Sequence, residues 1–361
     1  MTAGGALAPG RPRWPVTMLT GMLGSGKTTL LRHALSEPKM TGTVLLINEI
    51  GEIGIDHHLI ERIDGETILL RGGCLCCAFR ADLPQTLNVM RNRWLQDGTF
   101  DMQRVIVETT GLADPDPILL QLATNPLIKD DFPLSRVVVT VDAQHASDQI
   151  RRRRESQRQI AIADQVILTK SDVALPDATA TVERMIRSLN PHAPVIRVIG
   201  GRLAPRDWVG TSAGRSLVGF SMCSATAHDL SEIDTLSLTA ETPLGWSEFE
   251  PVLANIITEF GRALLRLKGI LNVSESERPV VIHGVHHVFY PVEFLDCWPD
   301  ADHRSRLVIV VESPASSRDR ILDLLTAGGS AWQLAGGHPH PASPEKPLPL
   351  SGQSSQHDGV R

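Results

Sequence analysis

The octapeptide Gly21-Met-Leu-Gly-Ser-Gly-Lys-Thr28 most constrains the fold of this chain, because it matches the phosphate-binding pattern G-x-x-x-x-G-K-[ST]. An apolar, strand-like run precedes it at residues 16–20, and a helical pattern follows at residues 29–35. In this context the loop turns backbone N–H groups toward phosphate, and the lysine reaches the β and γ oxygens. The threonine offers its hydroxyl to Mg²⁺. The pattern therefore predicts a nucleotide site formed by Gly21, Gly24, Ser25, Gly26, Lys27, Thr28 and Thr29.

Short apolar runs alternate with longer helical patterns in the first part of the chain, which is typical of βαβ units. The expected strands are residues 16–20, 44–47, 105–107, 137–141, 166–168 and 195–198. We predict an α/β P-loop NTPase domain with a mostly parallel sheet, followed by a smaller α+β C-terminal domain. The expected boundaries are a disordered leader at 1–13, the first domain at 14–205, a linker at 206–225, the second domain at 226–332 and a disordered tail at 333–361.

The run Arg104-Val-Ile-Val-Glu-Thr-Thr-Gly111 resembles a strand that ends in a Mg²⁺-directed carboxylate and leads into a switch loop. Glu108 stands where many P-loop proteins have Asp, and its extra methylene favours a water-mediated approach to Mg²⁺. Gly111 is a candidate for close approach to a γ-phosphate. With Lys27 and Thr28, Glu108 completes the predicted catalytic set, although a purely structural carboxylate is the alternative.

The tetrapeptide Thr169-Lys-Ser-Asp172 follows an expected strand and resembles the guanine-specifying pattern Asn-Lys-x-Asp. A carboxylate at Asp172 accepts hydrogen bonds from the ring N–H and exocyclic amine of guanine, whereas adenine presents an acceptor there. We therefore predict GTP as the nucleotide, bound in part by Thr169, Lys170 and Asp172. An exposed loop aspartate is the other interpretation.

Three of the five cysteines lie within four positions, at Cys74, Cys76 and Cys77. Adjacent cysteines rarely meet the geometry of a disulfide, and clustered thiolates favour a soft metal ion. Three ligands from one segment leave at least one position of a tetrahedral site open, so the ion is expected to be exchangeable. Buried inert cysteines and a thiol redox switch are the alternatives.

Together these motifs resemble the CobW-type P-loop GTPases, a family of metallochaperones related to the GTPases that mature urease and hydrogenase. The resemblance extends from about residue 16 to residue 311 and includes the stretches 48–56, 73–77, 108–115, 141–143 and 169–172. Residues 264–271 and 284–287 are similar to the CobW C-terminal domain.

This resemblance implies that the cysteine segment binds Zn²⁺, with Co²⁺ possible, and that Glu52 is a further metal ligand. His57 and His58 adjoin Glu52, but surface loop histidines are the simpler interpretation. If residues 280–289 form one strand, His283 and His287 share a face and His286 points away. These three histidines then do not converge on one metal ion.

Composition narrows the classes of partner. A net charge of −6 gives no overall attraction to nucleic acid, and no run of residues is long and apolar enough for a membrane span. Cysteines needed as thiols favour a reducing compartment, so we expect a cytoplasmic protein.

The leading hypothesis is a GTPase that transfers a transition metal to a client protein. The alternatives are a nucleotide-bound metal or thiol sensor without significant hydrolysis, a cobalt-handling protein of cobalamin biosynthesis, and an ATP-dependent small-molecule kinase.

Overall fold

The computed structural model describes residues 12–49, 67–71, 75–96, 101–111, 114–210, 233–312, 317–327 and 332–334. For residues 48–49, 67–71 and 75–82 it describes the backbone alone. The predicted leader lies almost wholly outside these ranges, and most of the predicted linker and tail does as well.

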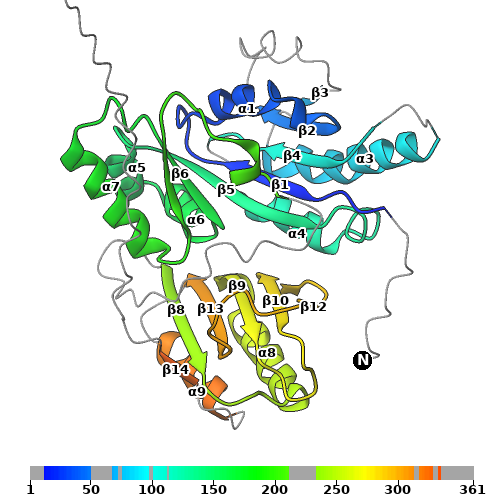
Figure 1. Cartoon of the computed structure of the whole chain (residues 1–361), viewed down its shortest axis with the longest axis vertical. Helices are drawn as coiled ribbons and strands as arrows, with labels where there is room; N and C mark the ends of the chain where they lie inside the picture. Colours follow the sequence, from blue (N-terminus) through cyan, green and yellow to red (C-terminus); the bar gives the residue numbers. More distant parts are fainter. Residues whose placement is uncertain are drawn as a thin grey trace, which may run out of the picture.

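A seven-stranded parallel sheet forms the N-terminal domain, in the order β3-β2-β4-β1-β5-β6-β7 (Figure 1). Its strands are β1 (Val16–Thr20), β2 (Thr43–Glu49), β3 (Thr67–Arg71), β4 (Arg104–Glu108), β5 (Leu134–Asp142), β6 (Gln165–Thr169) and β7 (Val195–Val198). The chain moves outward from β1 in one direction to β2 and later in the other to β5. The carboxyl end of β1 is therefore a topological switch point, where open α/β sheets bind their ligands. The predicted parallel P-loop fold is confirmed, although β3 was not among the strands expected from sequence.

Both faces of this sheet are covered, and alternate residues of each strand enter different cores. On β5, Val137 and Val139 point into one apolar cluster and Val138 into the other. The second, smaller cluster contains α1 (Lys27–Leu35) and the fully buried Trp208. The larger one contains side chains from α3 (Leu75–Gln96), α4 (Asp116–Thr124), α5 (Ala146–Arg152), α6 (Arg154–Ala161) and α7 (Pro176–Leu189). This double burial explains why the strands are nearly uniformly apolar.

Trp208 and Val209 fall within the segment predicted to be linker, yet both pack against the first sheet. The backbone N–H of Gly210 also donates to Thr17 Oγ1 at 2.9 Å. Residues up to Gly210 thus stay attached to the N-terminal domain.

The C-terminal domain contains an antiparallel sheet in the order β11-β10-β9-β13-β8-β14, with β12 paired to β10. Its strands are β8 (Ile233–Ala240), β9 (Leu264–Leu271), β10 (Val280–Val285), β11 (Val288–Phe289), β12 (Glu293–Phe294), β13 (Ser305–Glu312) and β14 (Trp332–Leu334). One face packs against α8 (Trp246–Phe260) and α9 (Ser317–Ala327). The predicted α+β character of this domain is confirmed.

The other face of this sheet lies against the N-terminal domain (Figure 1). Leu265, Val308 and Val310 join the large core of the first domain, whereas Leu307 and Ile309 point to α8 and α9. The two domains are therefore joined by a continuous apolar contact.

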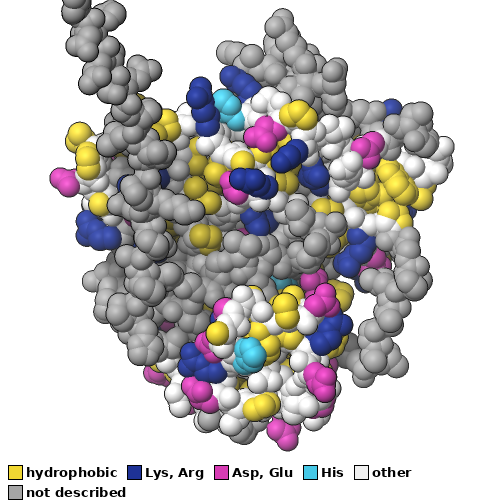
Figure 2. Space-filling view, viewed as in Figure 1, with side chains coloured by type: hydrophobic (Ala, Val, Ile, Leu, Met, Phe, Trp, Pro, Cys, Tyr) yellow, Lys and Arg dark blue, Asp and Glu magenta, His cyan; other side chains and the backbone are white. Residues whose placement is uncertain are grey.

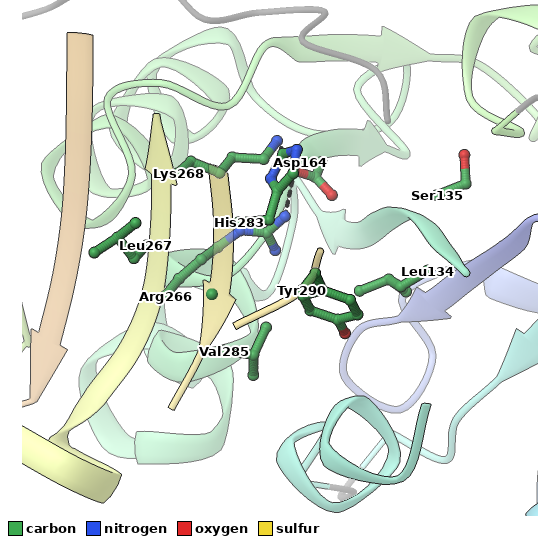
Figure 3. Close-up of a pocket in the computed structure, with 10 residues that line it drawn as sticks. Leu134, Ser135, Asp164, Arg266, Leu267, Lys268, His283, Val285 and Tyr290 are labelled. Carbon is green, nitrogen blue, oxygen red and sulfur yellow. Dashed lines mark hydrogen bonds and ion pairs between the residues drawn. The ribbon is translucent and has the colours of Figure 1, made fainter. Parts of the chain in front are cut away.

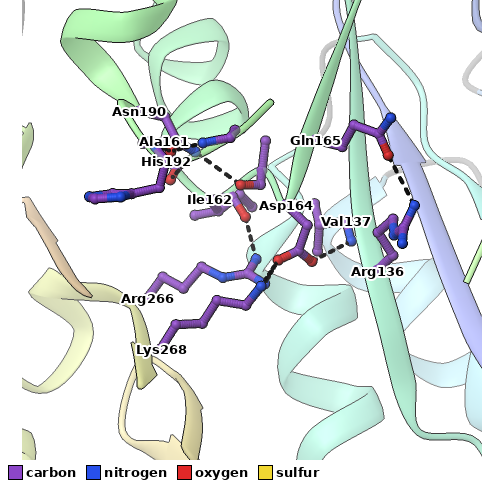
Figure 4. A network of polar contacts seen from close by, with 12 residues as sticks. Arg136, Val137, Ala161, Ile162, Asp164, Gln165, Asn190, His192, Arg266 and Lys268 are labelled. Atoms are coloured by element: carbon purple, nitrogen blue, oxygen red, sulfur yellow. Dashed lines mark hydrogen bonds and ion pairs between the residues drawn. The ribbon is translucent and has the colours of Figure 1, made fainter. Parts of the chain in front are cut away.

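A buried ionic cluster lies within this interface (Figure 4). Asp164 accepts from Arg266 Nη2 at 2.5 Å, from Lys268 Nζ and from the Val137 N–H at 2.8 Å. Burial alone raises the pKa of Asp164, but the charges of Arg266 and Lys268 outweigh it and hold that pKa well below its ordinary value. The carboxylate is thus ionised and ties two strand residues of one domain to the other.

The histidine segment differs from the prediction. β10 ends at Val285 and β11 begins at Val288, so His286 lies in a turn, with φ of 52°. His283 and His286 are both buried. Figure 3 shows His283 at a cavity of about 10 Å³ between the domains, which is no larger than one water molecule requires. The single-strand geometry expected for residues 280–289 was wrong.

On the face of the molecule shown in Figure 2, acidic and basic side chains are interspersed among the described residues. Among the helices of the described ranges, none has the length and apolar character needed to cross a bilayer.

Candidate nucleotide-binding site

The phosphate-binding loop connects β1 to α1 at the switch point of the sheet. Gly21 has φ of 138°, and a Cβ there would lie 2.3 Å from Thr140 O, so only glycine fits. Gly26 caps α1 in the left-handed region without a side-chain hydrogen bond. The first N–H groups of the helix are therefore left for a ligand, and the helix dipole favours an anion there.

Lys27 lies over this loop, with Nζ donating to Gly21 O at 2.8 Å and to Met22 O at 3.3 Å. Burial lowers the pKa of Lys27, and the negative charge of Glu108 opposes this shift. An ammonium held by carbonyl oxygens within the loop is positioned to exchange them for phosphate oxygens.

Glu108 ends β4, beside Leu19 at the end of β1, and is buried. Thr28, half-buried in the first turn of α1, follows the lysine. A buried carboxylate whose charge acts on Lys27 and a hydroxyl that directly follows Lys27 are oxygen ligands of the kind that Mg²⁺ prefers. The residues present therefore fit this ion.

The segment after β4 packs directly on the phosphate loop. Thr109 N–H donates to Leu19 O at 3.0 Å, and its hydroxyl donates to Thr20 Oγ1 at 2.7 Å. A Cβ on Gly111 would lie only 2.2 Å from Leu23 N. Because the two backbones are in contact, a shift of one loop must move the other.

The predicted base-recognition residues have separate positions. Thr169 donates its hydroxyl to Ser25 O at 2.7 Å, and Ser25 Oγ lies 2.6 Å from Thr140 Oγ1. Threonine at the first position of this motif thus braces the phosphate loop from β6. Asp172 is exposed beyond the strand end, where a ligand can reach it.

Lys170 adopts φ of 56° and forms an ion pair with Asp142 at 2.8 Å. Although burial raises the pKa of Asp142, hydrogen bonds from Lys170, the Gln144 amide and His145 together lower it. This pair fixes the direction of the loop that carries Asp172.

The sequence analysis included residues 141–143 in the family resemblance but gave Asp142 no role, and it missed the loop after β7 as a neighbour of α1. A Cβ on Gly201 would lie 2.8 Å from Thr29 Cγ2, so this loop touches the helix that follows the phosphate loop. Val173 is 60% exposed and Ile199, just after the end of the neighbouring strand β7, is 61% exposed. These two side chains supply apolar surface near the exposed carboxylate of Asp172. The adjacent glycines at 200–201 after a strand were the available signal.

The predicted metal ligands are described only in part. Cys76 and Cys77 lie in the first turn of α3, where the backbone alone is described, and Cys74 and Glu52 lie outside the described residues. Among the described side chains, no group of three or more His, Cys, Asp or Glu residues is arranged to hold a metal ion.

The switch-point phosphate loop, the buried Lys27 and the carboxylate at the end of β4 define a P-loop nucleotide-binding protein. Residues 15–197 match the model of the CobW/HypB/UreG nucleotide-binding domain, and residues 233–328 match the cobalamin synthesis protein CobW C-terminal domain. The chain belongs to the CobW family.

Characterised relatives agree with this assignment. The chain is 31% identical over 299 residues to the zinc chaperone YjiA of Escherichia coli, covering 82% of this chain and 93% of YjiA. It is 33% identical to the zinc-regulated GTPase metalloprotein activator 1 of Schizosaccharomyces pombe, over 52% of this chain and 46% of the yeast protein. The crystal structure of Zn(II)-bound YjiA GTPase from E. coli superposes with a TM-score of 0.59 at 26% identity, covering 87% of this chain and 98% of that one.

Proposed function

We propose that this protein is a GTP-hydrolysing metallochaperone that binds Zn²⁺ and delivers it to a client metalloprotein. The proposal rests on the order of four adjacent parallel strands in the sheet, which is β1, β4, β2 and β3. Their carboxyl ends lead into the phosphate loop, the Gly111 segment, the segment containing Glu52 and the cysteine segment. At about 4.8 Å per strand, the outer two of these ends are roughly 14 Å apart.

The register of the sheet supports communication between the nucleotide site and the proposed zinc site. Ile47 of β2 pairs with Glu108, and Glu49 pairs with Arg71 of β3. Glu52 follows Glu49 by three residues, and Cys74 follows Arg71 by three residues. We infer that Cys74, Cys76, Cys77 and Glu52 hold the zinc cargo, in segments that begin next to the nucleotide site.

Hydrolysis requires positioning more than covalent chemistry. The loop amides and the Lys27 ammonium bind the β- and γ-phosphate oxygens and offset their charge, while Thr169 keeps the loop in place through Ser25. The Thr28 hydroxyl and the Glu108 carboxylate would hold Mg²⁺, which would supply further neutralisation of the phosphate charge. The Gly111 backbone approaches the γ-phosphate, and Asp172 selects guanine.

Zinc transfer is driven only by a difference in zinc affinity between the GTP and GDP states. The test is a competition titration with a zinc chelator, performed with a non-hydrolysable GTP analogue and with GDP. We expect different zinc affinities in the two states, and loss of tight binding in a Cys76→Ser, Cys77→Ser variant. Equal affinities in both states contradict the handover mechanism even if GTP is hydrolysed.

Two further measurements separate the alternatives. Phosphate release that disappears in Lys27→Ala distinguishes a GTPase from a sensor that uses nucleotide as a structural ligand. Transfer of the γ-phosphate to a small acceptor, with preference for ATP, indicates a kinase. Tighter binding of Co²⁺ than of Zn²⁺ in the same titration favours a cobalt-handling role.

We further propose that the protein acts in the cytoplasm, because thiolate ligands require a reducing compartment.

A further inference from the structure

From Asp114 onward the described chain contacts the C-terminal domain, directly at Asp116 through His286 and indirectly at Asp114 through Arg158. Asp114 is three residues beyond Gly111, which limits the intervening chain to about 11 Å. The Asp114 carboxylate accepts from the Asp116 N–H at 3.0 Å and from Arg158 Nη1 at 3.2 Å. The start of α4 is therefore fixed to α6 by a charged hydrogen bond.

Arg158 divides its guanidinium between the two domains. Its Nε donates to Glu312 Oε1 at 3.2 Å and its Nη2 donates to Glu312 Oε2, while Nη1 faces Asp114. Hydrogen bonding to Glu312 raises the pKa of Arg158. The planar Arg158 guanidinium binds Glu312 along one edge and Asp114 through Nη1, so its orientation is fixed. Glu312 on β13 therefore determines where Arg158 holds Asp114.

A second contact reaches the same helix start from the β10–β11 turn. His286 Nε2 lies 3.0 Å from Asp116 Oδ2, and its Nδ1 lies 3.0 Å from Arg262 O. Both partners are acceptors, and a neutral imidazole can donate from only one nitrogen. His286 is therefore an imidazolium that clamps α4 to the C-terminal domain.

We propose that Arg158 and His286 are positioning residues through which the C-terminal domain holds the Gly111 segment against the phosphate loop. The inference rests on the proposed GTP hydrolysis. Arg158 and His286 both act on Asp114 and Asp116, and these act through the short connection to Gly111. The C-terminal domain is then part of the switch, and a partner that displaces its sheet changes nucleotide turnover.

The experiment uses the full-length protein and a substitution in the C-terminal domain. Glu312→Gln keeps the shape of the side chain but removes its charge, so Arg158 loses its strongest partner. We expect kcat for GTP hydrolysis to fall by about 2- to 30-fold, the range typical of such coupling networks, with KM within about two-fold. Arg158→Lys keeps the charge but lacks the fork, and it should show the same loss.

Ser237→Ala is the matched control, because Ser237 of β8 lies 2.6 Å from His192 across the domain interface but far along the chain from the switch. It should leave kcat unchanged. A double-mutant cycle of Asp114→Asn with Glu312→Gln should be non-additive in kcat. The positioning role is overturned if Glu312→Gln and Arg158→Lys keep the same kcat as Ser237→Ala and the double-mutant cycle is additive.

A binding readout keeps this result separate from the fate of the proposed function. The ring resonances of His286 should differ between the GDP and GTP-analogue complexes of the wild type, which requires nucleotide binding but no turnover. Absence of phosphate release by the wild type would overturn the proposed hydrolysis alone. Identical His286 resonances in the two complexes would overturn the coupling.

Discussion

Replacement of Gly111 by alanine tests the contact between the switch segment and the phosphate loop. The new Cβ would lie 2.2 Å from Leu23 N and 2.7 Å from both Leu23 Cα and Met22 C. All three are backbone atoms, so no side-chain rotation relieves the contact. The φ of Gly111 lies outside the left-handed region, so alanine suits its backbone conformation and the perturbation is steric.

The size of the effect follows from these distances. Ordinary contact begins at 3.4 Å, so the backbones must separate by about 1.2 Å, the difference between 3.4 and 2.2 Å. A misplacement of about 1 Å at a catalytic site costs up to roughly 100-fold in rate. Overpacking of this kind also reduces stability by about 1–3 kcal/mol. We therefore expect kcat for GTP hydrolysis to fall by about 100-fold, measured by single-turnover phosphate release at saturating GTP.

Gly245→Ala is the control, in the C-terminal domain and outside the nucleotide site. Gly245 has φ of −72°, and the nearest atom to an added Cβ is Glu248 Oε2 at 3.3 Å, which is the end of a flexible side chain. Alanine there meets neither left-handed backbone strain nor a clash with backbone atoms. The control should leave kcat unchanged. A Gly111→Ala variant with kcat within about three-fold of the wild type would refute the argument.

Three more outcomes are expected. Asp164→Asn leaves Arg266 without its buried counter-charge and should destabilise the protein by about 3–5 kcal/mol, visible as a lower melting temperature; an unchanged melting temperature contradicts the interface role. Asp172→Asn should weaken GTP binding by roughly 10- to 100-fold in a fluorescent-nucleotide titration, and equal affinity excludes Asp172 from base recognition. Burial lowers the pKa of His286, but the hydrogen bond and charge of Asp116 outweigh burial, so the pKa lies above its ordinary value of 6.5. The ion pair of His286 therefore stabilises the fold fully below pH 6.5, and this stabilisation is lost as pH rises through the raised pKa of the folded state. His286→Asn, which tolerates the left-handed turn, should flatten this part of the pH–stability curve measured by urea unfolding, and an unchanged curve argues against the ionised clamp.

The nucleotide site could be predicted largely from sequence because its parts are local. Residues 21–28 contain the glycines, the lysine and the threonine hydroxyl of the phosphate-binding loop within eight positions. Their capacity to bind phosphate is recognisable from residue type and spacing alone. Glu108 and Asp172 could be nominated for the same reason, since each ends or follows an apolar strand, and their roles in Mg²⁺ and guanine binding stay predictions. The parallel sheet then brought these strand ends to one edge, as its topology requires.

The histidine segment shows what sequence alone could not determine. Residues 280–289 are uniformly strand-like in composition, yet the left-handed His286 divides them into a hairpin. The apolar pattern does not encode that turn. It is stabilised by Asp116, which is remote in sequence and belongs to the other domain.

The sequence by itself determined the family, the nucleotide chemistry and the alternation of strands and helices, because these depend on short-range patterns. Only the tertiary structure revealed Thr169 bracing Ser25, Asp164 paired with Arg266, and Arg158 shared between Asp114 and Glu312. Such pairs join residues from 44 to 154 positions apart, and they form only where packing has already brought the surfaces together.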